Sequence, residues 1–149
     1  MNVIGSRRRP RSTTWGWGLL STLCVLLIVN AVWLFTAVGT PGVFEADTGV
    51  PASEFRAAYP TVADELAGRG RTIAVLLAGL ATLALAVTIT GLRTGAAWAR
   101  ASLWAFVAAL AAVAMNALFG GRADVGSFYA AWTVLAASGL LLTGRGASN

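Results

Sequence analysis

Charged residues, histidine and cysteine are all scarce in this chain. Its 149 residues include eleven basic and six acidic side chains, no histidine and one cysteine, Cys24. These absences exclude haem held by histidine, the usual zinc sites, histidine acid–base catalysis and an intrachain disulfide. With 11% charged residues and a mean hydropathy of +0.72, the chain has too few polar groups to cover a soluble domain of this size. We therefore predict that most of it is surrounded by lipid.

Four long stretches of the sequence contain no charged residue. They are residues 12–44, 72–92, 101–121 and 125–144. About 20 apolar residues in a helix cross the ~30 Å hydrocarbon core of a bilayer, so each stretch has room for one crossing. The stretches lack the alternating pattern of membrane β-strands. We predict an all-α fold, a four-helix transmembrane bundle, with spans at about 15–38, 72–92, 97–119 and 125–143.

Arginine is unevenly distributed between the two sides of such a bundle. Four crossings put both termini on one side, and that side carries seven arginines and no acid: Arg7, Arg8, Arg9, Arg11, Arg93, Arg100 and Arg145. The positive-inside rule makes this side cytoplasmic, with the topogenic cluster at Arg7, Arg8, Arg9 and Arg11. The predicted layout is a basic segment 1–14, a membrane domain 15–143 with an outer loop 39–71, and a cytoplasmic tail 144–149.

The basic N-terminus has other interpretations. Arginines before an apolar run are typical of a signal peptide, and the late first acid, Glu45, would suit a mitochondrial presequence. The apolar stretch from Trp15 to Gly39 is longer than a signal core and has aromatic residues near both ends, which favours a mature helix. All eleven cations are arginine, and the chain is rich in alanine and glycine. We therefore predict a bacterial plasma membrane, and an arginine cluster that touches lipid headgroups rather than nucleic acid.

The outer loop contains short helical signals. Residues 51–56 could start a helix in which Phe55 and Tyr59 share a face, and Pro60 should end it. A further helix then continues into the second span, which makes the loop partly helical. One interpretation is a cap that presents Phe44, Phe55 and Tyr59 to a partner or ligand. The other is that these rings rest in the headgroup layer.

The four uncharged stretches contain no carboxylate, histidine or arginine, which argues against a proton-coupled pump or an ion channel. Their strongest polar groups are Asn30 and Asn116, predicted either to hold helices together or, with Trp33 and Thr82, to contact a ligand. Small residues recur along the second span (Ala74, Ala78, Thr82, Ala86, Thr90) and the third (Ala101, Ala105, Ala109, Ala112, Asn116). We predict that both stripes are packing faces, either within the chain or between copies of it, because small side chains let helices approach closely.

The sequence also resembles a known group in layout. An opening helix, one long outer loop and three closely spaced helices, with Glu54-Phe55, Tyr59-Pro60, Gly91-Leu92-Arg93 and Trp98-Ala99, are similar to the DoxX-like group and to four-helix membrane proteins of actinobacteria. This resemblance implies a fold and no site residues.

No nucleophile with a neighbouring base, metal-binding set or cofactor motif occurs in the sequence, so we predict that the protein is not an enzyme and needs no cofactor or metal. The first functional hypothesis is an accessory, assembly or stabilising subunit of a larger membrane complex. Its partners would be the bilayer and other membrane subunits or further copies of itself, with no nucleic acid. The alternative is a binder or carrier of a small apolar ligand, a lipid or quinone, held between the helices.

Overall fold

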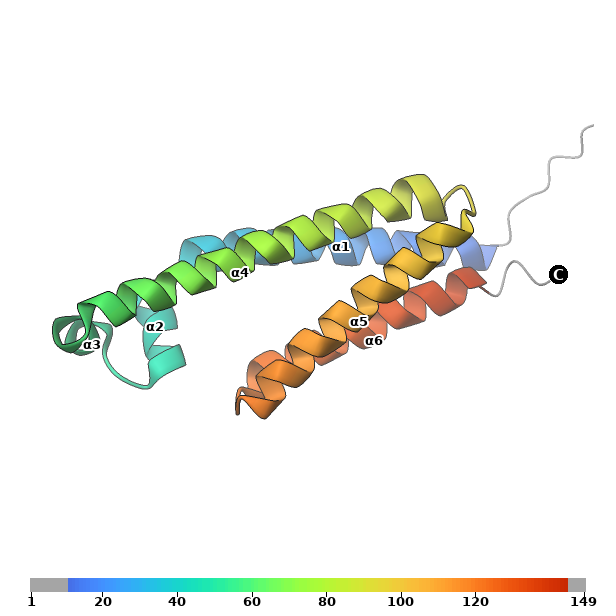
Figure 1. Ribbon diagram of the computed structural model, residues 1–149. Coiled ribbons are helices and arrows are strands. Elements are labelled where there is room, and N and C mark those ends of the chain that lie inside the picture. Colours follow the sequence, from blue (N-terminus) through green and yellow to red (C-terminus); the bar gives the residue numbers. More distant parts are fainter. Residues whose placement is uncertain (1–10, 145–149) are drawn as a thin grey trace, which may run out of the picture. The chain divides into compact units, whose positions relative to one another are not determined.

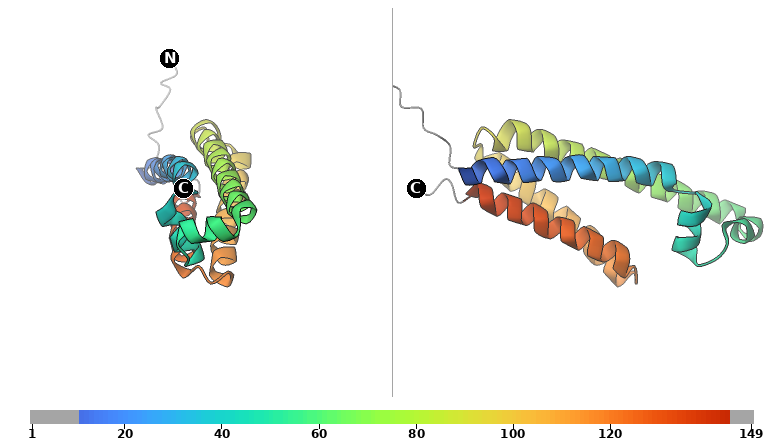
Figure 2. Two further views of the ribbon diagram at one scale, coloured as in Figure 1. Left: turned by 90° about the vertical axis from the view of Figure 1, so that its left-hand side faces the viewer. Right: turned by 180° about the vertical axis from the view of Figure 1, so that it is seen from behind.

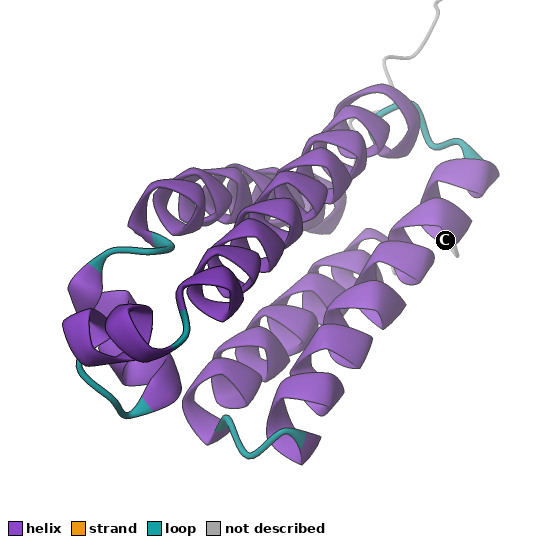
Figure 3. Ribbon diagram, turned by 60° about the vertical axis from the view of Figure 1, so that its left-hand side comes forward, coloured by secondary structure: helices purple, strands orange, loops and turns teal. Residues whose placement is uncertain are grey.

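The computed structural model describes residues 11–144, and these residues are helical apart from short loops (Figures 1 and 3). In chain order the elements are α1 (Arg11–Ala37), α2 (Pro41–Thr48), α3 (Ala52–Ala58), α4 (Pro60–Val87), the π-helix η1 (Thr88–Leu92), α5 (Ala97–Phe119) and α6 (Ala123–Gly144). Four helical segments are long and apolar enough to cross a membrane: Trp15–Ala37, Pro60–Leu92, Ala97–Phe119 and Ala123–Thr143. The predicted all-α, four-helix class is confirmed, and the chain is a multi-pass membrane protein.

The helix bounds differ from expectation mainly in the loop region. Helix α4 begins at Pro60, ahead of the span expected from residue 72, because the charged residues after Pro60 continue the same helix. Helix α2 was not predicted. It begins with Pro41, whose fixed φ suits a first helical turn, and ends at Gly49, whose φ of 70° is left-handed backbone that favours glycine.

Aromatic side chains mark a constant thickness along two of the spanning helices. Trp15 and Phe35 on α1 are both exposed, and so are Trp98 and Phe119 on α5. Each pair is separated by about 30 Å along its helix at 1.5 Å per residue, the thickness of a bilayer's hydrocarbon core. Tryptophan is enriched at the boundaries of that core, so the exposed Trp15 and Trp98 fit positions near one boundary.

The chain divides into two compact units, each described here by itself. The first comprises residues 1–24 and 83–149, and the second residues 25–82. In the first unit α5 and α6 form an antiparallel hairpin (Figure 1). The hairpin buries one face of α5, made of Ala99, Leu103, Phe106, Val107, Leu110 and Ala114. A Cβ at Gly126 of α6 would lie 2.5 Å from Cγ of Leu118, so the two helices are in close contact beside the loop that joins them.

A second close approach in this unit joins α1 to α6. A Cβ at Gly16 would lie 2.6 Å from the Thr143 methyl carbon and 2.7 Å from the Gly139 carbonyl oxygen. On the other helix, a Cβ at Gly139 would lie 3.0 Å from Cγ of Leu20. Glycine on both helices therefore allows their backbones to come together, the usual way in which membrane helices gain van der Waals contact.

In the second unit, α4 buries a seam made mostly of small residues. The buried residues of α4 in this unit are spaced alternately by about three and four positions, with half-buried Gly70 among them: Ala63, Ala67, Ala74, Leu77 and Ala81. Such alternation keeps one stripe facing a partner helix. The partner side includes Val38, whose methyl carbons would lie 2.9 and 3.0 Å from a Cβ at Gly70.

The small-residue stripe expected on α4 packs only in part within the chain. A strict four-residue spacing advances about 400° per step, so each member is turned about 40° from the previous one. From Ala74, which is buried, the stripe reaches Thr82, Ala86 and Thr90, all of which are exposed. Residues spaced alternately by three and four positions stay on one face of α4, whereas residues spaced by four positions throughout turn gradually around the helix.

Two glycines on α4 provide a matched test of this seam. Gly70→Ala is expected to destabilise the second unit by about 1–3 kcal/mol, because the added methyl group meets the stiff Val38 side chain. Gly68→Ala, two residues away, meets nothing within 4 Å and should be neutral or stabilising by up to about 1 kcal/mol. Unfolding of the two variants in mixed detergent measures the difference. Equal stability of the two variants would contradict the close packing of Val38 on the seam at Gly70.

Candidate functional site

A small folded cap lies between α1 and α4 in the second unit. Helix α2 follows α1 after a turn at Gly39, whose φ of 88° is left-handed, and α3 follows α2 after the turn at Gly49. Tyr59 separates α3 from α4, and its carbonyl accepts the hydrogen bond of the Ala63 N–H at 3.0 Å. These turns fold residues 41–58 back against the beginning of α4 (Figure 2). We call residues 40–63 the cap.

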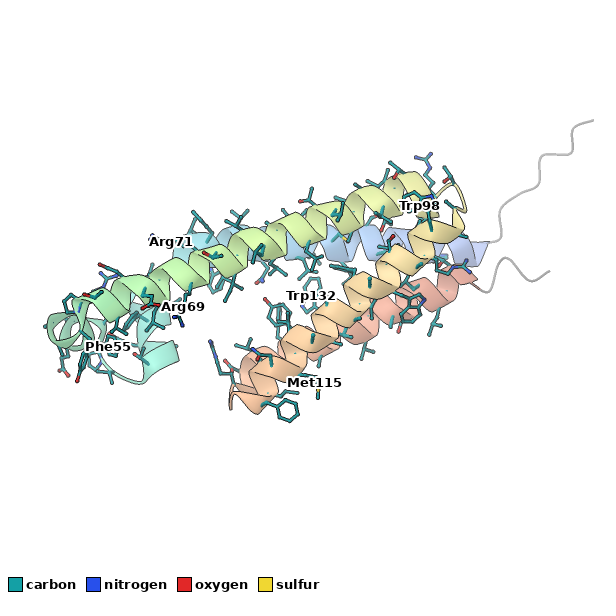
Figure 4. All side chains as sticks on the ribbon, viewed as in Figure 1. Phe55, Arg69, Arg71, Trp98, Met115 and Trp132 are labelled. Atoms are coloured by element: carbon teal, nitrogen blue, oxygen red, sulfur yellow. The ribbon has the colours of Figure 1, made fainter. Side chains whose placement is uncertain are left out.

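An aromatic cluster holds the cap together. Phe44 on α2 is buried and meets Phe55 on α3 edge to face, with ring centroids 5.1 Å apart. Phe44 packs in one cluster with Ala52 and with Ala63, which is fully buried on α4, and Phe55 covers this cluster. Tyr59 continues the row at 5.5 Å from Phe55, and its side chain is 59% exposed. Figure 4 shows Phe55 among these side chains.

The structure assigns different positions to the three aromatic residues predicted for the loop. Phe44 is inside the cap, so it is available neither to a partner nor to lipid headgroups. Phe55 is partly buried against it, and Tyr59 lies on the surface. The sequence analysis missed Ala52 and Ala63 as their packing partners, because two alanines separated by a proline carry no periodic signal.

Polar contacts fix the turns of the cap. The Glu45 carboxylate on α2 accepts the N–H of Ala52, near the start of α3, at 3.3 Å. The guanidinium of Arg56 donates to the carbonyl of Gly39 at 3.4 Å. Glu65 and Arg69 form an ion pair on α4 with both side chains well exposed, so it contributes little to stability.

The polar residues predicted inside the membrane do not assemble into a described site. Asn30 is half-buried and Trp33 exposed on α1, while the Thr82 hydroxyl donates to the Ala78 carbonyl of its own helix at 2.8 Å. Asn116 is exposed on α5. Within residues 11–144, neither asparagine amide has a hydrogen-bond partner. The oxygen of Ser21 on α1 also lacks one, although it is buried.

The alanine stripe expected to pack on α5 faces away from α6. Its members are exposed or half-buried and lie within an arc of about 100°, nearly opposite the buried face of the helix. We call this surface the outward face of α5; its middle consists of Ala101, Ala105, Ala108, Ala109, Ala112 and Asn116, and Trp98 and Phe119 lie on the same arc at its two ends. Met115 projects beside it, pointing away from the hairpin (Figure 4). The buried face of α5 carries Leu103, Phe106, Val107 and Leu110 instead, whereas other large residues of the helix, such as Trp104 and Phe119, are exposed.

Several arginines predicted to orient the chain can be placed. Arg11 begins α1, while Arg7, Arg8, Arg9 and Arg145 lie outside the described residues. Arg93 and Arg100 are exposed at the turn from η1 to α5. A Cβ at Gly91 would lie 2.5 Å from Cβ of Ala99 and 3.0 Å from the Trp98 ring, so this turn is tightly packed.

Within the described part of the chain, no three potential metal ligands come together. The chain matches no known family model, and comparison with characterised proteins and with solved structures finds no match. The resemblance to DoxX-like proteins stays a prediction, and the functional argument rests on the surfaces described above.

Proposed function

We propose that this protein is a non-catalytic subunit of the bacterial plasma membrane that associates laterally with other membrane helices, as an accessory or stabilising component. Four spanning helices with few polar groups and large apolar surfaces support a role in the bilayer. Both termini would be cytoplasmic, because the side they share carries seven arginines and no acid.

The outward face of α5 is the observation that carries this proposal. Membrane helices associate through small residues and interhelical hydrogen bonds, whereas a surface that meets only lipid gains nothing from being small. The exposed surface of α4 shows the lipid-facing composition, with Ile73, Val75, Leu76 and Leu83. The outward face of α5 has alanines and an amide without a partner instead. Asn116 lies one turn before the end of α5 at Phe119, where a neighbouring helix can supply a hydrogen bond to its amide.

Ala105→Leu tests the association. The added side chain would separate the helices at the middle of the outward face, and overpacking of 1–3 kcal/mol lowers an association constant by roughly tenfold or more. The tagged protein and the variant would be extracted in mild detergent after cross-linking in the native membrane. Recovery of a stoichiometric companion subunit by the wild type, and its loss in Ala105→Leu, is expected.

The matched control is Ala86→Leu, the same change at an exposed alanine on α4. It should leave recovery unchanged. A monomer without any companion at native expression would contradict the proposal, and so would equal losses in the two variants.

A further inference from the structure

Four chain segments meet at one end of the first unit. The contacts of Gly16 with Gly139 and Thr143 put the start of α1 beside the end of α6. Because α5 runs antiparallel to α6, the start of α5 lies at the same end, and Gly91 holds η1 against it. The blue and red helix ends lie together in Figure 2. We call this the arginine-rich end.

The charges of the first unit are segregated along its length. Arg93 and Arg100 are exposed at the arginine-rich end, where α1 also begins with Arg11. The sequence adds three arginines before α1 and Arg145 after α6, with no acid among them. Asp124, the one acid that the sequence has in this unit, begins α6 at the opposite end beside Arg122. The described residues of the unit include no acid at the arginine-rich end, so this end carries an excess of positive charge.

Tryptophan identifies the layer in which these arginines lie. Trp15 on α1 is 75% exposed and Trp98 on α5 is 58% exposed, and both are near the arginine-rich end. Figure 4 shows Trp98 at the turn that carries Arg93. Indole rings are most stable at the boundary between hydrocarbon and headgroups, so the neighbouring guanidinium groups are at the depth of lipid phosphates. Binding of a soluble partner such as RNA would not explain why exposed indole rings lie beside these arginines.

We propose that the arginine-rich end binds anionic phospholipids, with Arg93 and Arg100 contacting the headgroup phosphate, and thereby selects anionic over zwitterionic lipids. Guanidinium groups donate paired hydrogen bonds to phosphate oxygens, and an anionic headgroup brings net charge that a zwitterionic one lacks. The Trp98 ring, held by its contact with η1 at Gly91, lies alongside the glycerol and upper acyl region of the same lipid. This inference does not depend on lateral association through α5.

The test uses the full chain reconstituted with equal amounts of phosphatidylglycerol and phosphatidylcholine. Lipids retained after mild delipidation are counted by native mass spectrometry. The wild type should retain phosphatidylglycerol preferentially, and the preference should fall as salt is raised. The double variant Arg93→Gln/Arg100→Gln is expected to lower the preference by about fivefold for each arginine, or about 25-fold together. The lysine double variant should keep most of it, because it keeps the charge.

Arg122→Gln is the matched control, since it removes an arginine from the opposite end of the same unit. It should leave the lipid preference unchanged. Equal retention of the two lipids by the wild type would overturn the proposal, as would an equal loss in Arg122→Gln. Displacement of the lipid by millimolar inorganic phosphate or by a short RNA would also overturn it, because the site would then recognise a soluble anion. If the glutamine variant loses helical circular dichroism, the proposal is judged on the salt dependence of the lipid preference in the wild type and in the lysine variant. A preference that does not fall with salt in these two proteins would overturn it.

Discussion

Phe44→Ala is expected to unfold the cap while the spanning helices remain folded. Removing a buried phenylalanine costs about 3–5 kcal/mol when the surrounding structure cannot close the cavity. Few other contacts stabilise the cap, because its described core consists of Phe44, Ala52 and Ala63 with Phe55 packed against them. Both α2 and α3 are too short to persist alone, so the loss of this core should release them together.

Limited proteolysis of the membrane-embedded protein measures this effect. The wild type should resist cleavage between α2 and α3, and Phe44→Ala should be cut there at least tenfold faster. Tyr59→Ala is the control, because the Tyr59 ring is mostly exposed and its loss removes little burial. A Phe44→Ala protein as resistant as the wild type would show that the aromatic cluster does not hold the cap.

Gly16→Leu is expected to separate α1 from α6 in the first unit. Even a single carbon at this position would lie 2.7 Å from the carbonyl oxygen of Gly139. Because this oxygen belongs to the backbone of α6, it cannot move aside unless the helix shifts. Overpacking of this kind costs about 1–3 kcal/mol and occasionally more, and leucine places three further carbons in the same contact. Gly16→Ala should show a smaller loss in the same direction.

The measurement is the unfolding midpoint of the purified protein in mixtures of mild detergent and dodecyl sulfate. Gly18→Leu is the matched control, two residues away on α1, where an added Cβ meets nothing within 4 Å. We expect a clear drop in the midpoint for Gly16→Leu and none for Gly18→Leu. If both variants unfold together with the wild type, the α1–α6 contact does not contribute to stability.

The four spanning helices were predictable because lipid leaves few choices. A charge is costly in hydrocarbon, so the positions of Arg71, Arg93, Arg100 and Asp124 limit where spans can lie. Helix α2 was missed because its eight residues mix proline, glycine and acids, and they fold only against a partner. The signal that could have revealed it was the pairing of Pro41 with Gly49, a first-turn residue and a helix-ending one.

The helix faces were harder to predict than the helices. The alanine stripe on α5 was expected to pack within the chain or between copies of it; within the chain Leu103, Phe106 and Leu110 are buried instead, and the stripe faces outward. Both faces of such a helix are apolar enough to meet lipid. Which of them is buried therefore depends on the shape of the partner helix, and composition does not reveal it. The close contact between Gly16 and Gly139 joins residues more than a hundred positions apart, and glycine is common in this sequence. Neither residue could be selected without the fold.

Helix α4 is continuous from the cap into the hydrocarbon. Within the second unit it runs without interruption from Pro60 to Thr82, so no flexible joint separates the surface carrying Tyr59 from the buried seam at Ala74 and Leu77. A companion that grips the cap and tilts it would turn the embedded part of the same rod by an equal angle. A displacement of the cap core at Ala63 would therefore carry Ala74 and Leu77 of the same helix with it.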